Sequence, residues 1–349
     1  MEELFRIRKK LIGGKRVFII AEAGVNHNGN LELAKELVYQ AKKSGADAVK
    51  FQSFRADYMC LRSLKEKKDI KSLTKGSDSA YDMYKALELS LDSHIELIRL
   101  AKKEKIIFMS SVFDLEMVGI LKKFGVDALK IASGDITFKP LIESAVKTKL
   151  PVFLSSGMSD EKEISRAVLW AKKAGAKKFA LLHCVSLYPP NFEELNLNFI
   201  RTLNKKYSFP IGYSDHTKGY EACIAAVALG AKIIEKHFTL EGNLKGPDHA
   251  ISLNPKQFSE MVEKIRNIEN SLGSEKKVLS RRELKERKSG RRGLKASIDI
   301  NKGDIITNEN SVFIKPENGV KPFEAKKVFG KRAAKRIPKG SPIHLRDVK

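Results

Sequence analysis

The stretch PIGYSDHTKGYEACIAAVALGAKIIEKHFTL, residues 210–240, decides the fold of this chain. Two short apolar runs flank an Ala-rich segment from Tyr220 to Leu229, a pattern that favours a helix packed on a sheet and ended by Gly230. A strand, a helix and a second strand in this order form a unit whose strands run parallel. The strands end in His216 and His237, and neighbouring strands lie about 4.8 Å apart. The two imidazoles could meet on one divalent ion, or they could be unrelated polar residues at strand ends.

The same pattern repeats along the chain. Apolar runs predict eight strands, at 17–24, 47–54, 106–113, 127–134, 151–158, 178–186, 209–216 and 232–240. A period of 3.6 predicts helices at about 30–44, 84–104, 115–124, 140–149, 160–174, 193–206, 218–229 and 255–272. Eight such units predict an α/β fold, a (β/α)8 TIM barrel, for which roughly 250 residues is typical. A doubly wound open sheet is the alternative, and the lack of a G-x-G-x-x-G motif at the first turn counts against it.

Segments at both ends of the chain extend this predicted barrel. Gly13-Gly14 predicts a tight hairpin turn, within an N-terminal hairpin that caps the base of the barrel. The barrel domain is expected to span 1–272, and the charged stretch 273–292 is interpreted as a partly helical linker. In 293–349, short apolar runs broken by turns predict a small β-rich domain.

The composition is typical of a globular protein and bounds the class of function. The chain has 349 residues, 42% of them hydrophobic, and no apolar run near the roughly 20 residues of a membrane span. The N-terminus lacks the apolar core of a signal peptide, and three scattered cysteines suggest free thiols, so we expect a cytoplasmic protein. The formal net charge is +24, but its lysines are spread over helix surfaces without interleaved aromatics. We therefore expect a basic surface that attracts a small anionic substrate rather than nucleic acid or a membrane.

Polar residues gather at the C-terminal ends of the predicted strands, where barrel folds build their sites. All eight strands contribute to this set, which comprises Glu22, Asn26, His27, Lys50, Gln52, Ser110, Ser111, Lys130, Ser133, Asp135, Ser155, Ser156, His183, Ser186, Tyr188, Ser214, Asp215, His216, Glu235 and His237. The convergence of so many polar side chains predicts an active site at this face of the barrel.

Two lysines of this set lie inside otherwise apolar strands, where an ammonium group without an anion is costly. Lys50 and Lys130 could form structural ion pairs with Glu22 and Glu235. Together with the nearby serine hydroxyls they could instead cradle a phosphate or a carboxylate. A Schiff-base lysine is a third option, but two lysines among many serines favour non-covalent anion binding.

The strand-end histidines indicate a metal. Histidine with oxygen ligands suits Mn²⁺, Mg²⁺, Zn²⁺ or Co²⁺, so we predict that His216 and His237 hold a divalent ion above the anion. Such an ion acts as a Lewis acid on a carbonyl group. His27 and His183 are explained at least as well as structural histidines oriented by the backbone.

With these residues the chain resembles the sialic acid synthase family, which condenses phosphoenolpyruvate with an N-acylated hexose to give a nonulosonic acid. The matching motifs are IIAEAGVNHNG at 19–29, GADAVKFQSF at 45–54, KIASGD at 130–135, LSSGM at 154–158, LLHCVSLYP at 181–189, GYSDHT at 212–217, EKHFT at 235–239 and GPDH at 246–249. The tail resembles the family's antifreeze-like SAF domain. The motif AEAGVNHNG is more similar to sialic and legionaminic acid synthases than to pseudaminic acid synthases.

The resemblance implies a divalent metal, usually Mn²⁺ with Mg²⁺ or Co²⁺ as alternatives, and a homodimer swapped through the SAF domain. By motif, His216 and His237 match the metal ligands. The match to the phosphoenolpyruvate cradle comprises Lys50, Ser111, Lys130, Ser133, Ser155 and Ser214. The groups that match those around the sugar are Glu22, Gln52, Tyr188 and Asp248.

Three features depart from the family pattern. Lys315 stands before Pro316, where the SAF domain usually has an arginine that contacts the sugar, and lysine lacks the bidentate fork of arginine. Ser186 stands where family members can have asparagine, and we retain both residues as substrate-binding. The loop 55–82, which should border the sugar, matches no strong motif.

The resemblance also implies the reaction. The acceptor would be N-acetylmannosamine or 2,4-diacetamido-2,4,6-trideoxymannose, its aldehyde activated by the metal, with C–O cleavage of phosphoenolpyruvate and with Glu22 and Asp248 positioning hydroxyls and handling protons. One alternative is another phosphoenolpyruvate-condensing synthase that accepts arabinose 5-phosphate or erythrose 4-phosphate. The other is a non-catalytic barrel that binds ice or a polyanion through its SAF domain.

Overall fold

The computed structural model describes residues 3–65, 74 and 76–349. The chain divides into two compact units, Met1–Gly273 and Ser274–Lys349, and each is described by itself below.

Eight parallel strands close into a barrel in the first unit, in the order in which they occur along the chain. They are β3 (Phe18–Gly24), β4 (Ala48–Ser53), β5 (Ile107–Val112), β6 (Ala128–Ile131), β7 (Val152–Ser155), β8 (Phe179–Cys184), β9 (Ile211–Asp215) and β10 (Ile233–His237). The last strand, β10, pairs with both β9 and β3, which closes the sheet. The predicted TIM barrel is confirmed, and the open-sheet alternative is wrong.

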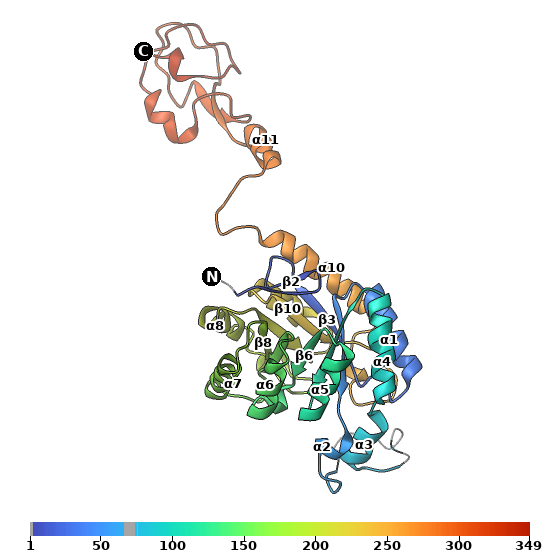
Figure 1. The fold of residues 1–349 in the computed structure, drawn as a ribbon. Coiled ribbons are helices and arrows are strands. Elements are labelled where there is room, and N and C mark those ends of the chain that lie inside the picture. The colour runs from blue at the N-terminus through green and yellow to red at the C-terminus, as the bar shows by residue number, and fades with distance from the viewer. Residues whose placement is uncertain (1–2, 66–73, 75) are drawn as a thin grey trace. The chain divides into compact units, whose positions relative to one another are not determined.

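Amphipathic helices surround these strands (Figure 1). They are α1 (Leu31–Lys43), α4 (Leu91–Lys103), α5 (Leu115–Phe124), α6 (Lys139–Lys147), α7 (Glu161–Lys173), α8 (Phe199–Lys206), α9 (Glu221–Ala228) and α10 (Pro255–Leu272). In α1 the buried residues recur at helical spacing and form one apolar stripe, made of Ala34, Leu37, Val38 and Ala41. In the described part of the chain, no helix is both long and apolar enough to cross a membrane.

The helix predicted at 84–104 is wrong, because the structure has two helices there. These are α3 (Ala80–Leu87) and α4, and the short α2 (Ala56–Met59) precedes them. Ser90 takes an extended backbone, and its hydroxyl accepts a hydrogen bond from the backbone N–H of Ser93, which starts a new helix. In Figure 1, α2 and α3 lie at the end of the barrel away from the N-terminus. Part of the loop 55–82 lies outside the described residues.

A hairpin closes the N-terminal end of the barrel. Strand β1 (Phe5–Ile7) pairs antiparallel with β2 (Lys10–Ile12), so the turn lies at Arg8-Lys9 and not at the predicted Gly13-Gly14. Arg8 is held in a left-handed conformation, and its guanidinium donates to Asp127 at 2.7 Å. The apolar side chains of the hairpin pack into the barrel floor, a cluster that includes Phe5, Ile7, Ile12, Phe18, Ile20, Met109 and Phe153.

The two strands that carry the histidines approach closely. A Cβ atom at Gly212 would lie 2.7 Å from Cβ of Ile233 and 2.8 Å from its carbonyl oxygen, closer than such atoms pack. Any other residue at this position would push β9 away from β10. The helix between them ends at Ala228, and Gly230 follows with a φ of 103°, as the sequence predicted.

The second unit is small and rich in turns. It contains α11 (Arg281–Gly290) and a two-stranded antiparallel sheet of β11 (Gly293–Ala296) and β12 (Ser311–Ile314). Short 3-10 segments cover Pro322–Lys327 and Leu345–Asp347. Its own core is a cluster of buried aliphatic residues, namely Leu294, Ala296, Ile300, Ile306, Val320, Val328, Ala333, Ile337 and Ile343.

Candidate active site

A cavity of about 230 Å³ lies at the C-terminal ends of the barrel strands. Twelve of the fourteen predicted site residues line it, namely Glu22, Lys50, Gln52, Ser111, Lys130, Ser133, Ser155, Ser186, Tyr188, Ser214, His216 and His237. The closed barrel brings these residues together although they are spread over more than 200 positions of the sequence. Asp248 does not line this cavity, and Lys315 belongs to the second unit.

Two lysines and two glutamates form an ion network within the cavity. Lys50 Nζ lies 2.7 Å from Glu22 Oε2, and Lys130 Nζ lies 2.9 Å from Glu235 Oε1. Lys50 also lies 3.7 Å from Glu235, so one carboxylate is shared between both ammonium groups. All four side chains are at most 6% exposed. The ion pairs considered from the sequence are therefore present, and they balance two buried positive charges with two negative ones.

The two carboxyl groups of this network are not equivalent. Burial raises the pKa of Glu22, and the charge of Glu235 raises it further against the opposing effect of Lys50. Burial also acts on Glu235, but the charges of Lys130 and Lys50 outweigh it and lower the pKa to about 2. Glu235 is therefore ionised throughout the neutral range, whereas Glu22 is the carboxyl better suited to hold a proton.

Serine hydroxyls surround the lysines. Ser111 Oγ accepts a hydrogen bond from Lys50 at 2.9 Å, Ser214 Oγ donates to Glu235 at 2.9 Å, and Ser133 Oγ accepts from the backbone N–H of Gly157 at 3.0 Å. The hydroxyl of Ser155 is buried and forms no hydrogen bond within the described residues. An unpaired buried hydroxyl costs roughly 1–3 kcal/mol, so a ligand oxygen in this cavity would relieve a real penalty.

The two strand-end histidines lie side by side. The ring centroids of His216 and His237 are 5.3 Å apart, and the ring of Tyr188 lies 4.1 Å from that of His216. His216 donates from Nδ1 to the carbonyl oxygen of Val185 at 2.8 Å, which leaves Nε2 as the nitrogen that can bind a metal. Burial opposes the charged forms of Cys184 and His216, but each stabilises the other's charge, so the pKa of the thiol is lowered and that of the imidazole is raised.

These donors fit a divalent metal that takes part of its ligands from substrate and water. No group of three or more His, Cys, Asp or Glu side chains is arranged to hold a metal in the described residues. Asp248 approaches the pair, since its Oδ2 lies 3.8 Å from Nδ1 of His237. Two imidazoles with a carboxylate nearby are a donor set that Mn²⁺, Mg²⁺ or Co²⁺ can use.

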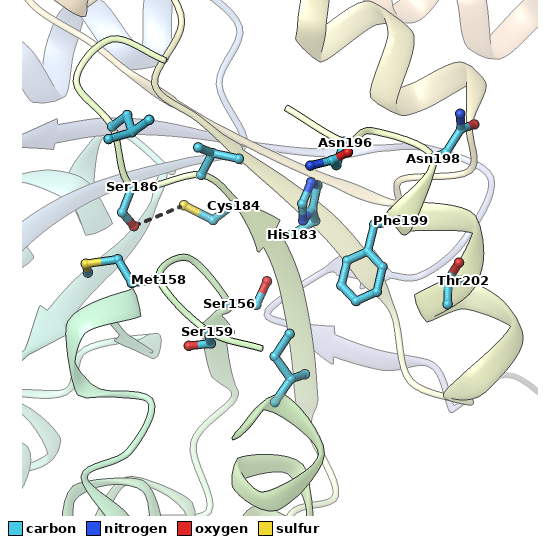
Figure 2. Close-up of a pocket in the computed structure, with 13 residues that line it drawn as sticks. Ser156, Met158, Ser159, His183, Cys184, Ser186, Asn196, Asn198, Phe199 and Thr202 are labelled. Carbon is cyan, nitrogen blue, oxygen red and sulfur yellow. Dashed lines mark hydrogen bonds between the residues drawn. The ribbon is translucent and has the colours of Figure 1, made fainter. Parts of the chain in front are cut away.

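A second cavity, of about 730 Å³, lies beside the first and shares Met158, Cys184 and Ser186 with it. Figure 2 shows Cys184 and Ser186 joined by a hydrogen bond of 4.0 Å, with His183 on the same wall. His183 is a structural residue, because its Nε2 bonds the carbonyl oxygen of Leu195 at 2.7 Å.

The loop that carries Asp248 forms a hydrogen bond with the loop after β3. His249 bonds Thr239 through Nδ1 at 2.7 Å and Asn28 through Nε2 at 3.3 Å. His27 is also structural: it accepts a hydrogen bond from the backbone of the adjacent turn. Burial lowers the pKa values of His27 and His249 to about 4, so both are neutral at pH 7.

Comparison with known proteins agrees with this geometry. The model of the NeuB family matches residues 37–277, and the SAF domain model matches residues 291–349. The chain belongs to the NeuB family.

Individual relatives of this NeuB chain carry synthase names. It is 42% identical over 330 residues to the N,N'-diacetyllegionaminic acid synthase of Legionella pneumophila, covering 93% of each chain. It is 36% identical to a pseudaminic acid synthase of Campylobacter jejuni, covering 95% of this chain and 97% of the other. The crystal structure of an N-acetylneuraminic acid synthetase from Leptospira borgpetersenii superposes with a TM-score of 0.73 and 39% identity, covering 82% of this chain and 95% of that one. The chain is thus an enzyme of the nonulosonic acid synthase type, and the resemblance read from its motifs is confirmed.

The SAF domain of this NeuB chain contains Lys315, the predicted substitute for the family arginine. Lys315 is exposed just after β12, and its carbonyl oxygen accepts a hydrogen bond from Lys295 at 3.2 Å. Its side chain belongs to the second unit, and its role toward the sugar remains a prediction.

The predicted list of site residues omitted Glu235 and Cys184, which both line the cavity of this NeuB chain. Glu235 was counted among the polar strand-end residues and as an ion-pair partner but was given no role toward the substrate, yet it joins both lysines and Ser214. Cys184 was treated only as a free thiol. Side chains alternate along a strand, so its position two residues after Leu182 of the inward cluster places it on the inner face of β8.

Proposed function

We propose that this chain condenses phosphoenolpyruvate with an N-acylated hexose to give a nonulosonic acid and inorganic phosphate. The proposal rests on one observation: a single cavity contains residues that can bind an anion and, above them, residues that can bind a metal. Two lysines and several serines lie inside the barrel strands, and two adjacent histidines lie at the strand ends above them. An anion and a polarised carbonyl group would therefore be held one above the other.

Phosphoenolpyruvate would bind at the level of the lysines. Its carboxylate and phosphate would take the charges of Lys50 and Lys130, together with the hydroxyls of Ser111, Ser133, Ser155 and Ser214. Ser155 supports this assignment because its buried hydroxyl has no partner among the described residues. Glu22 supports it too, since its raised pKa lets it accept a proton and release Lys50 for the ligand.

His216 and His237 would hold the divalent metal, for which Mn²⁺ is our first choice and Mg²⁺ or Co²⁺ the alternatives. A metal bound there supplies Lewis acidity to the aldehyde oxygen of the open-chain sugar. The Val185 carbonyl fixes the tautomer of His216, and the ring of Tyr188 shields one face of that imidazole.

The reaction would then form one carbon–carbon bond and one carbon–oxygen bond, and break one carbon–oxygen bond. C3 of phosphoenolpyruvate attacks the aldehyde carbon, and positive charge develops at C2, close to the ionised Glu235. Water adds to C2, and phosphate leaves with its bridging oxygen. Glu22 can exchange a proton with these groups, because its pKa is raised and its carboxyl also accepts a hydrogen bond from Gln52 at 3.3 Å.

For the acceptor we favour the diacetamido hexose that leads to legionaminic acid over N-acetylmannosamine. The support is the higher identity to a legionaminic acid synthase, 42%, than to the N-acetylneuraminic acid synthetase, 39%. Gln52, Tyr188 and Asp248 would contact the sugar hydroxyls and the acyl arm. In a homodimer swapped through the SAF domain, Lys315 of the partner subunit would contact the same sugar.

The test is phosphate release from phosphoenolpyruvate with Mn²⁺, measured for each acceptor with and without chelator. The acceptors are N-acetylmannosamine, its 6-phosphate, the diacetamido hexose and arabinose 5-phosphate. We expect release with an N-acyl hexose only, and its loss on chelation. Release with arabinose 5-phosphate alone would support the eight-carbon synthase instead, and no release with any acceptor would contradict the proposal.

A further inference from the structure

The strands β9 and β10 match one another residue by residue at their C-terminal ends. Ser214 faces Glu235 in the register, and Asp215 faces Lys236. The same offset continues to His216 and His237, whose rings are neighbours. Successive side chains on a strand point to opposite faces. The serine–glutamate and histidine pairs therefore face the cavity, and the pair between them faces outward, toward α9.

This outward pair is a fully buried ion pair. Lys236 Nζ lies 2.8 Å from Asp215 Oδ2, and both side chains are 0% exposed. Asp215 accepts further hydrogen bonds from the Tyr213 hydroxyl at 3.1 Å and from the Cys223 thiol at 3.3 Å. The pair is thus enclosed between the sheet and the helix that follows β9.

The pair also holds the residues on both sides of His216. Asp215 precedes this histidine, and Thr217, which follows it, donates from its backbone N–H and from its hydroxyl to Asp215, each at 3.0 Å. Lys236 donates to the carbonyl oxygen of Thr217 as well as to Asp215. Because Lys236 itself precedes His237, one ammonium group ties the backbone around one histidine to the backbone beside the other.

We propose that Asp215 and Lys236 are positioning residues that set the distance between the imidazoles of His216 and His237. The inference rests on the proposed function, in which these two histidines hold a divalent metal. Groups behind metal ligands orient them, and their loss typically lowers metal affinity 10- to 100-fold. Here the orienting group acts through the backbone on two ligands at once.

Apolar residues of the same shape can replace a buried ion pair with little loss of stability. Stability alone therefore does not explain this pair, whereas a positioning role does. A pair that served only to join β9 and β10 would affect every ligand of the cavity equally. A positioning pair affects the metal more than phosphoenolpyruvate, since Lys50 and Lys130 come from β4 and β6, on other parts of the barrel. Of the groups around the anion, Ser214 and Glu235 come from β9 and β10.

The test compares two ligands on the same full-length proteins. Metal-free parent, Lys236→Met, Asp215→Asn and the double variant are titrated with Mn²⁺, and free Mn²⁺ is measured by electron paramagnetic resonance. The same proteins are titrated with phosphoenolpyruvate by calorimetry without metal. We expect the Kd for Mn²⁺ to rise about 10- to 100-fold in the variants, while the Kd for phosphoenolpyruvate changes by a much smaller factor. The double variant leaves no unpaired buried charge, so it keeps the test valid if a single variant does not fold.

A matched control lies at the opposite end of the barrel. Arg266 Nη2 pairs with Asp47 Oδ2 at 3.3 Å, and both side chains are largely buried, 16% and 5% exposed. Asp47→Asn with Arg266→Met should lower stability but leave Mn²⁺ binding as in the parent.

Two results would overturn the inference while the proposed function stands. One is parent-like Mn²⁺ affinity in all three variants, and the other is an equal loss of affinity for Mn²⁺ and phosphoenolpyruvate. A parent that binds no Mn²⁺ would overturn both the inference and the metal assignment.

Discussion

Glu235 Oε1 lies 2.9 Å from Lys130 Nζ, inside a barrel where both side chains are at most 6% exposed. The same oxygen lies 3.7 Å from Lys50 Nζ, so this single carboxylate balances the charges of both ammonium groups. An incoming anion must compete with it for the lysines. Glu235 therefore sets the charge balance of the site before an anion binds.

Glu235→Gln should lower the free energy of unfolding by about 3 kcal/mol, because it leaves buried ammonium groups without their shared partner. Added phosphoenolpyruvate should raise the stability of this variant more than that of the parent, since its charges replace the lost carboxylate. Urea unfolding with and without ligand measures both effects. Glu324→Gln, which breaks a surface pair with Lys327, should change stability far less. Equal losses in the two variants would contradict the network.

Ser155→Ala should leave stability unchanged or slightly raised, because the buried hydroxyl that it removes has no partner among the described residues. The KM for phosphoenolpyruvate should rise about tenfold, the value of one hydrogen bond to a charged ligand. Steady-state kinetics and thermal unfolding are the measurements.

The neighbouring hydroxyl provides the control for Ser155. Ser156 donates to the carbonyl oxygen of Leu182 at 3.1 Å, so Ser156→Ala should lose about 1 kcal/mol of stability and keep its KM. An unchanged KM in Ser155→Ala would place the anion elsewhere in the cavity.

Chelation should remove the turnover of the parent, and added Mn²⁺ should restore it. In His216→Ala the turnover should stay absent at any Mn²⁺ concentration, because one of two protein ligands is gone. His183→Gln tests the specificity of this effect, since His183 bonds a backbone carbonyl and should not bind the metal. Near-normal activity of His216→Ala with Mn²⁺ would refute the ligand assignment.

Stability should fall as the pH drops from 6.5 to 4. Burial lowers the pKa values of His27 and His249 from 6.5 to about 4, so between these limits the unfolded chain binds more protons than the folded one. The stabilisation is complete above pH 6.5 and is lost progressively as the pH falls, at up to about 1.4 kcal/mol per pH unit for each histidine. Urea unfolding between pH 4.5 and 8 gives the slope.

His249→Gln should reduce that slope, because it removes one of the histidines whose pKa values are lowered by burial. An unchanged slope would show that His249 is not buried in its neutral form.

Much of the site could be predicted because strand ends in a barrel converge whatever lies between them. Lys50 and Lys130 are polar interruptions of apolar strands, and this contrast is visible in a linear sequence. The partners of these lysines depend on which strands become neighbours, so the sharing of Glu235 between them needed the closed barrel.

Local conformational choices were harder to predict. The turn of the N-terminal hairpin forms at Arg8, a residue with no turn preference, because the distant Asp127 holds its side chain, whereas Gly13-Gly14 is the stronger local signal. The helical period runs on from α3 to α4, and only the capping of Ser90 interrupts it. In both cases the hydrogen bonds of one side chain outweighed the average preference of the segment.

The hydrophobic floor that Phe5 and Phe153 build closes the cavity at the base of the barrel. Lys50 and Lys130 lie in the third positions of their strands, whereas His237 is the last residue of its own. A ligand held by the lysines lies deeper than one held at the histidines. It must therefore bind first, and it cannot leave while the outer ligand is bound. The two substrates should therefore bind in a fixed order, with phosphoenolpyruvate first and the sugar after it. Excess sugar should inhibit turnover by binding to the free enzyme.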